Sequence, residues 1–253
     1  MPTLAVIPAR LWAARLSRKP LRELGGVPLV IRVWERVMEA GVADRVVVAT
    51  DRDEVARVVR GAGGECVLTS QAHLSGTDRV AEVVAMPDFA TFDLVLNVQG
   101  DEPFVDSDAM RGALDAASGP AEIGTTAVRA SSDVLDNPAV VKVVCGDDGR
   151  ALYFSRAPIP FLRDQGDRST RDALVRQHLG VYAYTRGALA AWVSLPAHPL
   201  EISEHLEQLR PLAAGMRIGV ATASEVPVMG GIDTEDDLER ANAIWSDFTA
   251  GRT

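Results

Sequence analysis

The sequence predicts a three-layer α/β/α fold in which a mainly parallel mixed sheet is covered by helices on both faces. Short runs of apolar and β-branched residues alternate with amphipathic helical patterns over most of the 253 residues. These runs are continuously apolar, as in parallel strands that are buried on both faces. The length suits one large domain, and the chain contains no evident linker or repeat. We therefore expect a single domain over residues 1–253, with a segment inserted at roughly 153–176.

Strands and helices alternate regularly in the first half of the chain. Pro28 opens a helix whose apolar stripe extends to Met38, and Gly41 follows its end. Asp51 or Asp53 is expected to cap the next helix, which runs through Arg60. The other elements expected here are strands at 3–9, 45–50, 65–68 and 93–98 and helices at 75–85 and 106–117.

The pattern changes after Ala121, where predicted strands follow one another with short connections. Pro158, Pro160 and the polar stretch 163–171 indicate an excursion from the main sheet. The expected elements are strands at 123–129, 140–144, 151–154, 178–184 and 217–222 and helices at 200–214 and 234–245.

Charge and hydropathy exclude several classes of partner. The net charge of −9 and the pI near 5.0 argue against sequence-independent binding to nucleic acid or to an anionic membrane. No apolar stretch approaches the roughly 18 residues of a membrane helix, and a predicted strand follows Met1 without a signal-peptide pattern. Cys66 and Cys145 lack metal-ligand spacing. We expect a cytoplasmic protein without nucleic-acid or membrane partners.

A basic loop follows the first predicted strand, at the position where open α/β sheets bind ligands. It contains Lys19, which is one of only two lysines in an arginine-rich chain; the other is Lys142. The loop lacks the Gly-rich Walker pattern, so a polyphosphate would be held by Arg10, Arg15, Lys19 and backbone N–H groups from Ala9 onward. An ordinary solvated loop is the alternative.

Two acidic segments are candidate metal ligands. Gly100 is followed by Asp101 and Glu102 directly after a predicted strand, and Asp233 precedes the closing helix. Mg²⁺ commonly takes one or two carboxylates together with substrate phosphates. The alternatives are a simple turn at Asp101 and helix capping by Asp233.

The remaining polar candidates are weaker. Ser75 and Arg79 begin a predicted helix and could contact a base or ribose, whereas a Glu-Gln pair on a helix is usually a solvated face. No supported Ser-His-Asp arrangement and no activated cysteine is present in the sequence. The other candidates are Arg156, His178, Glu207 and Gln208.

Together these segments resemble the 3-deoxy-manno-octulosonate (Kdo) cytidylyltransferases. The resemblance runs nearly end to end, and the combination of the turn at 97–103 with the motif at 206–210 is specific to that family. Other matching segments are 7–10, 15–16, 19–21, 49–51, 75–77, 139–144, 151–157, 178–180 and 233–238.

The resemblance implies a Rossmann-like nucleotidyltransferase fold and transfer of CMP from CTP to the anomeric hydroxyl of Kdo, with Mg²⁺ as cofactor. It also implies a homodimer with residues 155–164 near the interface. By motif, the triphosphate residues are Arg10, Arg15 and Lys19, the cytidine residues are Ser75, Arg79 and Gln99, the metal ligands are Asp101 and Asp233, and the sugar residues are Arg156, His178, Tyr182, Glu207 and Gln208.

The basic loop also departs from the family pattern. Ala13, Ala14, Ser17 and Arg18 replace Ser, Thr, Pro and Gly. A position that needs a positive φ accepts Gly far more readily than Arg. Pro211 is expected to bend the helix at 200–214. A related acidic sugar, such as amino-Kdo or a sialic-acid-like sugar, and a non-catalytic nucleotide-binding module remain alternatives.

Overall fold

The computed structural model describes residues 1–12 and 15–250. The chain divides into two compact units, which are treated separately. The terminal unit comprises Met1–Ser107 and Pro227–Thr253, and the central unit comprises Asp108–Val226. None of the described helices is both long enough and apolar enough to cross a bilayer.

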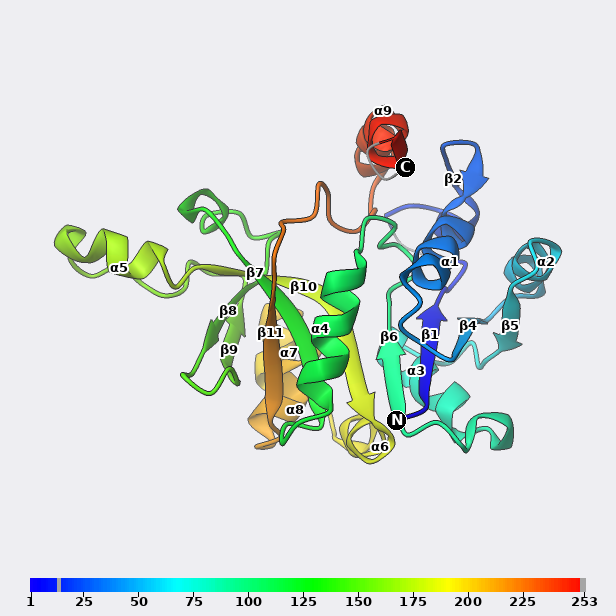
Figure 1. The fold of residues 1–253 in the computed structure, drawn as a ribbon, viewed down its shortest axis with the longest axis horizontal. Coiled ribbons are helices and arrows are strands. Elements are labelled where there is room, and N and C mark those ends of the chain that lie inside the picture. Colours follow the sequence, from blue (N-terminus) through cyan, green and yellow to red (C-terminus); the bar gives the residue numbers. More distant parts are fainter. Residues whose placement is uncertain (13–14, 251–253) are drawn as a thin grey trace. The chain divides into compact units, whose positions relative to one another are not determined.

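A parallel sheet forms the core of the terminal unit (Figure 1). Its order is β6-β1-β4-β5, and every neighbouring pair is parallel. All six residues of β1 are buried, which explains its continuous apolar sequence. The strands are β1 (Thr3–Pro8), β4 (Arg45–Thr50), β5 (Glu65–Leu68) and β6 (Leu94–Asn97), with a separate hairpin of β2 (Glu23–Leu24) and β3 (Val27–Pro28).

Helices cover this sheet on both faces. Both α1 and α3 contact β1 and β4. Right-handed crossovers from β1 through β4 to β5 put α1 and α2 on one face, and the return to β6 puts α3 on the other. The helices are α1 (Leu29–Ala40), α2 (Asp53–Gly61), α3 (Gly76–Ala85) and α9 (Glu235–Ala250), with short 3₁₀ turns η1 (Lys19–Leu21) and η2 (Pro87–Phe89).

The closing helix α9 is anchored by an aromatic contact with the hairpin. Trp245 packs with Phe104 at a ring-centroid distance of 5.6 Å and lies in a buried cluster with Leu24 and Leu29. A Cβ on Gly25 would lie 2.3 Å from the Trp245 ring, and Gly25 has a φ of +56°. Only glycine therefore suits this hairpin position.

Two details of the predicted helices are wrong. Met38 is 51% exposed because it lies at the edge of the apolar stripe, while Ile31 is buried instead. The α2 cap is Arg52, without a side-chain cap hydrogen bond. Asp51 accepts a hydrogen bond from the Leu11 N–H instead, and Asp53 lies within the first turn, where a carboxylate favours the helix dipole.

The central unit contains a mixed sheet. β7 lies between β11, which runs parallel to it, and β10, which runs antiparallel; β8 and β9 continue antiparallel from β10. The mixed sheet confirms the predicted fold class. The strands are β7 (Ile123–Arg129), β8 (Lys142–Cys145), β9 (Ala151–Ser155), β10 (Arg176–Thr185) and β11 (Ile218–Ala223).

Helix α4 (Ser107–Ala117) packs closely on β7, since a Cβ on Gly124 would lie 2.1 Å from the Ala113 carbonyl oxygen. The excursion between β9 and β10 carries α5 (Figure 1). The other helices are α5 (Arg168–Asp172), α6 (Arg186–Ser194), α7 (Pro199–Glu204) and α8 (Leu209–Ala213), with 3₁₀ turns η3 (Ser132–Val134) and η4 (Gln165–Asp167).

The predicted helix at 200–214 is wrong, because the chain forms two helices there. α7 ends at Glu204, its C-cap His205 has a left-handed φ of 53°, and α8 begins at Leu209. Pro211 lacks an N–H, so it is tolerated in the first turn of a helix but not in its interior. Restarting the helix at Leu209 places Pro211 in a first turn, so the proline is accommodated by a break rather than a bend.

Candidate active site

The basic loop leaves the carboxyl end of β1 and is fixed by backbone contacts. Ala9 N–H donates to the Ala49 carbonyl at 2.8 Å, and Leu11 N–H donates to Asp51 Oδ1 at 3.1 Å. A Cβ on Gly100 would lie 2.8 Å from the Pro8 carbonyl oxygen. The glycine therefore lets the turn after β6 approach the start of the loop. Residues 13–14, which include the Ala13 and Ala14 replacements, lie outside the described residues.

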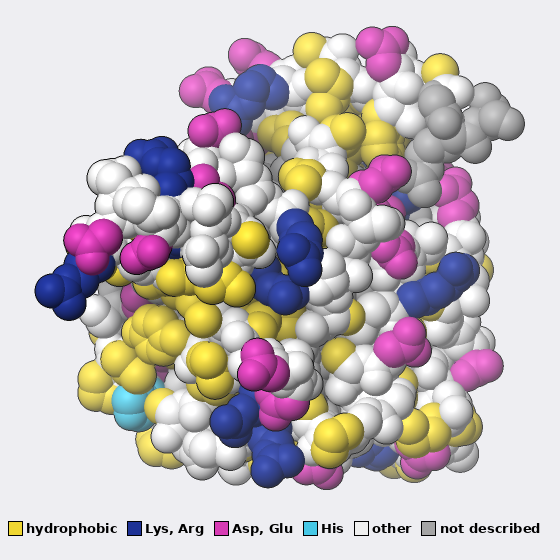
Figure 2. All heavy atoms as spheres, turned by 60° about the vertical axis from the view of Figure 1, so that its left-hand side comes forward, with side chains coloured by type: hydrophobic (Ala, Val, Ile, Leu, Met, Phe, Trp, Pro, Cys, Tyr) yellow, Lys and Arg dark blue, Asp and Glu magenta, His cyan; other side chains and the backbone are white. Residues whose placement is uncertain are grey.

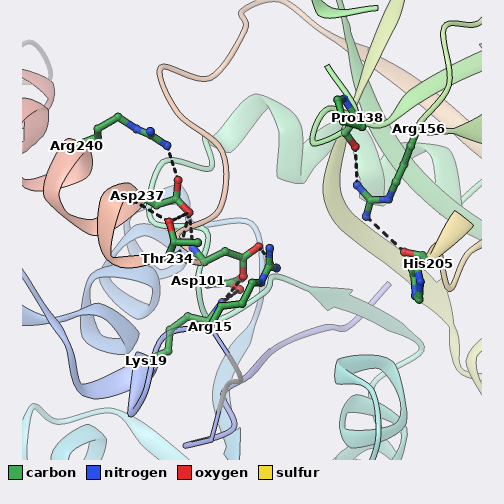
Figure 3. A network of polar contacts seen from close by, with 10 residues as sticks. Arg15, Lys19, Asp101, Pro138, Arg156, His205, Thr234, Asp237 and Arg240 are labelled. Atoms are coloured by element: carbon green, nitrogen blue, oxygen red, sulfur yellow. Dashed lines mark hydrogen bonds and ion pairs between the residues drawn. The ribbon is translucent and has the colours of Figure 1, made fainter. Parts of the chain in front are cut away.

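Lys19 joins the basic loop to both acidic segments (Figure 3). Its Nζ lies 2.5 Å from Asp101 Oδ2 and 2.7 Å from Asp233 Oδ1, while Arg15 Nη2 lies 2.7 Å from Asp233 Oδ2. Burial lowers the pKa of Lys19, but the ion pairs with Asp101 and Asp233 outweigh it and leave the pKa above its ordinary value. The four residues form one charged cluster, called the Lys19 cluster below.

The side chain of Asp233 does not cap helix α9, because two neighbouring residues do. Asp237 accepts hydrogen bonds from the N–H groups of Asp233 and Thr234, and the Thr234 hydroxyl accepts from the Asp237 N–H at 3.1 Å. This reciprocal pair caps α9. The Asp233 carboxylate is therefore directed to Lys19 and Arg15 rather than to the helix.

The geometry of the Lys19 cluster fits a divalent cation. Two carboxylates from separate loops already converge on one cationic atom, the Lys19 Nζ. Within the described ranges, no group of three or more His, Cys, Asp or Glu side chains is arranged to hold a metal. Two carboxylates completed by substrate phosphates are a usual Mg²⁺ environment, so Asp101 and Asp233 fit that ion.

Glu102 is part of this site, although the sequence did not identify it. Burial raises the pKa of Glu102 to about 8, and the nearby charges of Asp101 and Asp233 act in the same direction. A Cβ on Gly231 would lie 2.9 Å from Glu102 Oε1, so the Gly230–Gly231 segment passes close to this carboxyl group. The pair of adjacent acids at 101 and 102 was the sequence feature that could have identified Glu102. The two carboxyl groups have different surroundings in the structure.

The three predicted cytidine residues, Ser75, Arg79 and Gln99, differ in their surroundings. A Cβ on Gly76 would lie 2.8 Å from Gln99 Oε1, so the start of α3 and the end of β6 meet here. Ser75 Oγ caps α3 by accepting from the Asp78 N–H at 3.1 Å. Arg79 is 2% exposed and donates to Thr69 Oγ1 and to a backbone carbonyl, which makes it a support of the neighbouring loop.

Arg10 is exposed, and Arg18, which stands where the family pattern has Gly, has a left-handed backbone. Arg18 has φ 55° and ψ 32°, directly before η1, and its guanidinium pairs with Glu54 in the first turn of α2. The substitution of Gly by Arg therefore keeps the turn, at a conformational cost of about 1–2 kcal/mol. The ion pair with Glu54 supplies a contact that glycine could not make.

In the central unit, His178 and Tyr182 lie together among aromatic rings. The His178 ring centroid lies 5.0 Å from that of Phe154 and 5.4 Å from that of Tyr182. Burial lowers the pKa of His178 to about 3, so the imidazole is neutral at pH 7. The Tyr182 hydroxyl is buried without a hydrogen-bond partner among the described residues. Such an orphaned polar group indicates a place for a ligand.

Arg156 is held by backbone carbonyls of the central unit (Figure 3). Its Nε donates to the Glu204 carbonyl and its Nη1 to the Pro138 carbonyl, both at 2.9 Å. Lys142 is fully buried and donates to three carbonyls, including that of Arg156 at 2.5 Å. Burial, followed by the charge of Arg156, lowers the pKa of Lys142. The second lysine is thus a structural cross-link beneath Arg156.

The predicted sugar residues Glu207 and Gln208 do not lie on a helix face. They occupy the turn between α7 and α8, and Gln208 is 6% exposed at the start of α8. Glu207 lies close enough to contribute to the raised pKa of Tyr182, after burial and Tyr184. The solvated-face alternative is therefore wrong for this pair.

A family model described as cytidylyltransferase matches residues 4–218. The chain is 62% identical over 246 residues to a 3-deoxy-manno-octulosonate cytidylyltransferase of Gemmatimonas aurantiaca, covering 97% of the chain and 95% of that relative. It is 46% identical to one of Yersinia pseudotuberculosis, covering 96% of the chain and 98% of that relative.

Two solved structures share the fold. One is a CMP:2-keto-3-deoxy-manno-octonic acid synthetase complexed with CTP, with a TM-score of 0.88 and 34% identity over 98% of the chain and 99% of that structure. The other is an inositol-1-phosphate CTP transferase from T. maritima, with a TM-score of 0.67 and 16% identity over 99% of the chain and 97% of that structure. The second likeness concerns the fold alone.

Proposed function

This chain belongs to the cytidylyltransferase family, and we propose that it transfers CMP from CTP to the anomeric hydroxyl of Kdo and releases pyrophosphate. The 62% identity to a 3-deoxy-manno-octulosonate cytidylyltransferase covers nearly the whole of both chains. The structural observation that carries the proposal is the Lys19 cluster, which gathers cations and carboxylates at the carboxyl ends of parallel strands.

Binding of the triphosphate is assigned to Arg10, Arg15 and Lys19. Arg10 is exposed, whereas Arg15 and Lys19 are already paired with carboxylates. Guanidinium groups grip phosphate oxygens in pairs, and a lysine ammonium follows charge as a point on a flexible stem. We expect Lys19 and Arg15 to share their charge between Asp233 and the phosphates when CTP binds.

Asp101 and Asp233 are the proposed magnesium ligands. When bound, Mg²⁺ would neutralise phosphate charge and stabilise the charge that develops on departing pyrophosphate. The support is the convergence of the two carboxylates on the Lys19 ammonium, at 2.5 and 2.7 Å. The two acids are thereby already oriented toward a shared positive charge.

The sugar pocket is assigned to Arg156, His178, Tyr182, Glu207 and Gln208 of the central unit. Neutral His178 and the Tyr182 hydroxyl, which has no hydrogen-bond partner within residues 1–12 and 15–250, support binding of a polyhydroxylated ligand by hydrogen bonds. Arg156 is engaged by backbone carbonyls, so we propose that it mainly shapes the pocket and contributes positive charge near the sugar carboxylate. The nucleophile is the sugar's own hydroxyl, and no covalent enzyme intermediate is required.

The chain is proposed to be a homodimer, with the excursion at 155–164 near the interface. Figure 2 turns the side of the central unit that carries α5 forward and shows apolar side chains gathered beside basic ones. Phe161 is 83% exposed and Leu174 is 52% exposed. Exposed apolar patches are typical of protein contacts. Analytical ultracentrifugation of the wild type and of Phe161→Asp tests this; a wild-type monomer would contradict it.

A pyrophosphate-release assay tests the proposed function. We expect release only when CTP, Mg²⁺ and Kdo are all present, and none when GTP replaces CTP. Asp115→Asn is a matched control because Asp115 is exposed on α4 and belongs to no proposed site. Activity with a sialic-acid-like sugar but not with Kdo would favour the alternative acceptor. CTP binding without turnover on any acidic sugar would favour a binding module.

A further inference from the structure

An irregularity in β10 brings two of the proposed sugar residues together. Leu179 lies opposite Thr126 of β7, and Tyr182 lies opposite Thr125, so β10 advances three residues while β7 advances one. In a regular strand, residues four apart are separated by about 13 Å. The ring centroids of His178 and Tyr182 are only 5.4 Å apart. The bulge therefore builds this aromatic pair, as bulges beside functional sites often re-aim side chains.

Thr125 ties the bulge to the imidazole. Its Oγ1 lies 2.7 Å from the Val181 carbonyl oxygen and 2.9 Å from His178 Nε2. A hydroxyl has one proton, and a carbonyl oxygen can only accept, so Thr125 donates to Val181, the nearer of two carbonyls; that of Leu179 lies 3.4 Å away. The hydroxyl oxygen must then accept from His178, which places the imidazole proton on Nε2 and leaves Nδ1 as an acceptor.

We propose that Thr125 is a positioning residue for the sugar pocket, which fixes His178 as the Nε2–H tautomer so that Nδ1 accepts a hydrogen bond from a substrate hydroxyl. The idea rests on the proposed function, because the sugar is the ligand assigned to His178. The adjacent Tyr182 hydroxyl is buried and has no hydrogen-bond partner in the part of the chain that the structure describes, which independently indicates that a polar ligand completes this pocket. Phe154 also contacts the imidazole, in an edge-to-face arrangement at a centroid distance of 5.0 Å.

The first test reads the tautomer directly by ¹⁵N spectroscopy of the histidine rings in the full chain without substrate. The chain has four histidines, so the His178 signals are assigned by their loss in His178→Phe. Wild type and Thr125→Ser are expected to show a protonated Nε2 and an unprotonated Nδ1. Thr125→Val keeps the side-chain shape without the hydroxyl, so its signals should move toward a mixture of tautomers. A wild-type proton on Nδ1, or unchanged signals in Thr125→Val, would overturn the proposal.

The second test separates positioning from general structure. Thr125→Val should raise the KM for the sugar by about tenfold, the value of one typical hydrogen bond, and leave the KM for CTP unchanged. Thr125→Ser should restore the wild-type KM within about threefold. An equal rise in both KM values, or no rescue by serine, would sink the positioning role. If the valine variant does not fold, the wild-type tautomer and the kinetics of Thr125→Ser still test the positioning role of Thr125. Absence of any wild-type turnover would instead refute the proposed function and leave the tautomer result standing.

Discussion

The candidate site in the terminal unit is a set of charges on loops, whereas the one in the central unit is a set of neutral rings on a strand. In the Lys19 cluster, the carboxylate side chains of Asp101 and Asp233 are 28% and 43% exposed. In the central unit, His178 is buried enough to stay neutral, and Tyr182 stacks on Tyr184 and meets Trp192 edge-to-face. We therefore expect the first site to work by exchanging ion-pair partners and the second by holding its rings in one arrangement.

This difference predicts different responses to substitution. Ion pairs that are partly solvated can be remade with an incoming triphosphate and a metal, so their contribution to folding is small. A buried neutral imidazole costs stability whenever it must take a proton. Substitutions in the Lys19 cluster should therefore affect turnover more than folding. Substitutions of His178 or Tyr182 should affect folding more than turnover.

The largest expected effect is on catalysis. Asp101→Asn removes a negative charge that faces both Lys19 and the proposed metal, and we expect kcat to fall by about a thousandfold. Steady-state kinetics measures the loss, and thermal unfolding should place the variant within a few degrees of Asp115→Asn. Near-normal turnover would rule out a metal role for Asp101.

Lys19→Arg tests whether charge alone suffices. The Lys19 Nζ reaches two carboxylates from a side chain that is 13% exposed, and a planar guanidinium cannot take the same place. We expect kcat to fall by about a hundredfold with CTP binding retained, measured by calorimetry alongside kinetics. Full activity would mean that the site requires only a positive charge.

The central unit should respond to pH through stability. The pKa of His178 is about 3 in the folded protein and about 6.5 when unfolded, so the unfolded chain binds the extra proton between these values. Stability contributed by neutral His178 is full above pH 6.5 and is lost as the pH falls, by up to about 1.4 kcal/mol per pH unit.

Urea unfolding from pH 7 to pH 4 measures this slope. His178→Phe should flatten it, while His205→Asn, at an exposed position whose positive φ suits asparagine, should not. Equal slopes in the two variants would show that His178 does not set the pH response.

The smallest expected effect is on stability and concerns Arg18 in the basic loop. Arg18→Gly and Arg18→Ala both remove the ion pair with Glu54, so their difference isolates the positive φ. The glycine variant should be more stable by about 1 kcal/mol in urea unfolding. Equal stability would mean that the loop does not need a left-handed residue there.

The sequence predicts the terminal unit well because its signals are local. Strand ends, the Gly100 turn and the basic loop are each contained within a few residues, and they come together at one edge of a parallel sheet. Asp233 could not be assigned in this way, because a capping residue and a ligand have the same local pattern. Only the Thr234–Asp237 pair distinguishes them.

The central unit was harder to predict because its decisive contacts are long-range. The link between Thr125 and His178 joins strands that are 53 residues apart and depends on a bulge that has no signature in either strand. The break at His205 follows from Pro211 six residues later, which the sequence indicated only as a bend. Strand positions were predictable, whereas the irregularities around the proposed sugar residues were not.

Because the chain has only two lysines, labelling of side-chain amines can be assigned to one or the other. Lys19 belongs to the terminal unit and Lys142 to the central unit, and the latter is fully buried beneath three carbonyls. Acylation needs the neutral amine, so the ion-paired Lys19 should react slowly when the site is empty, and Lys142 should react only when the central unit opens. Intact-mass analysis with the α-amino group as internal standard would then follow the ion pairing of Lys19 in one unit and opening of the other in one sample.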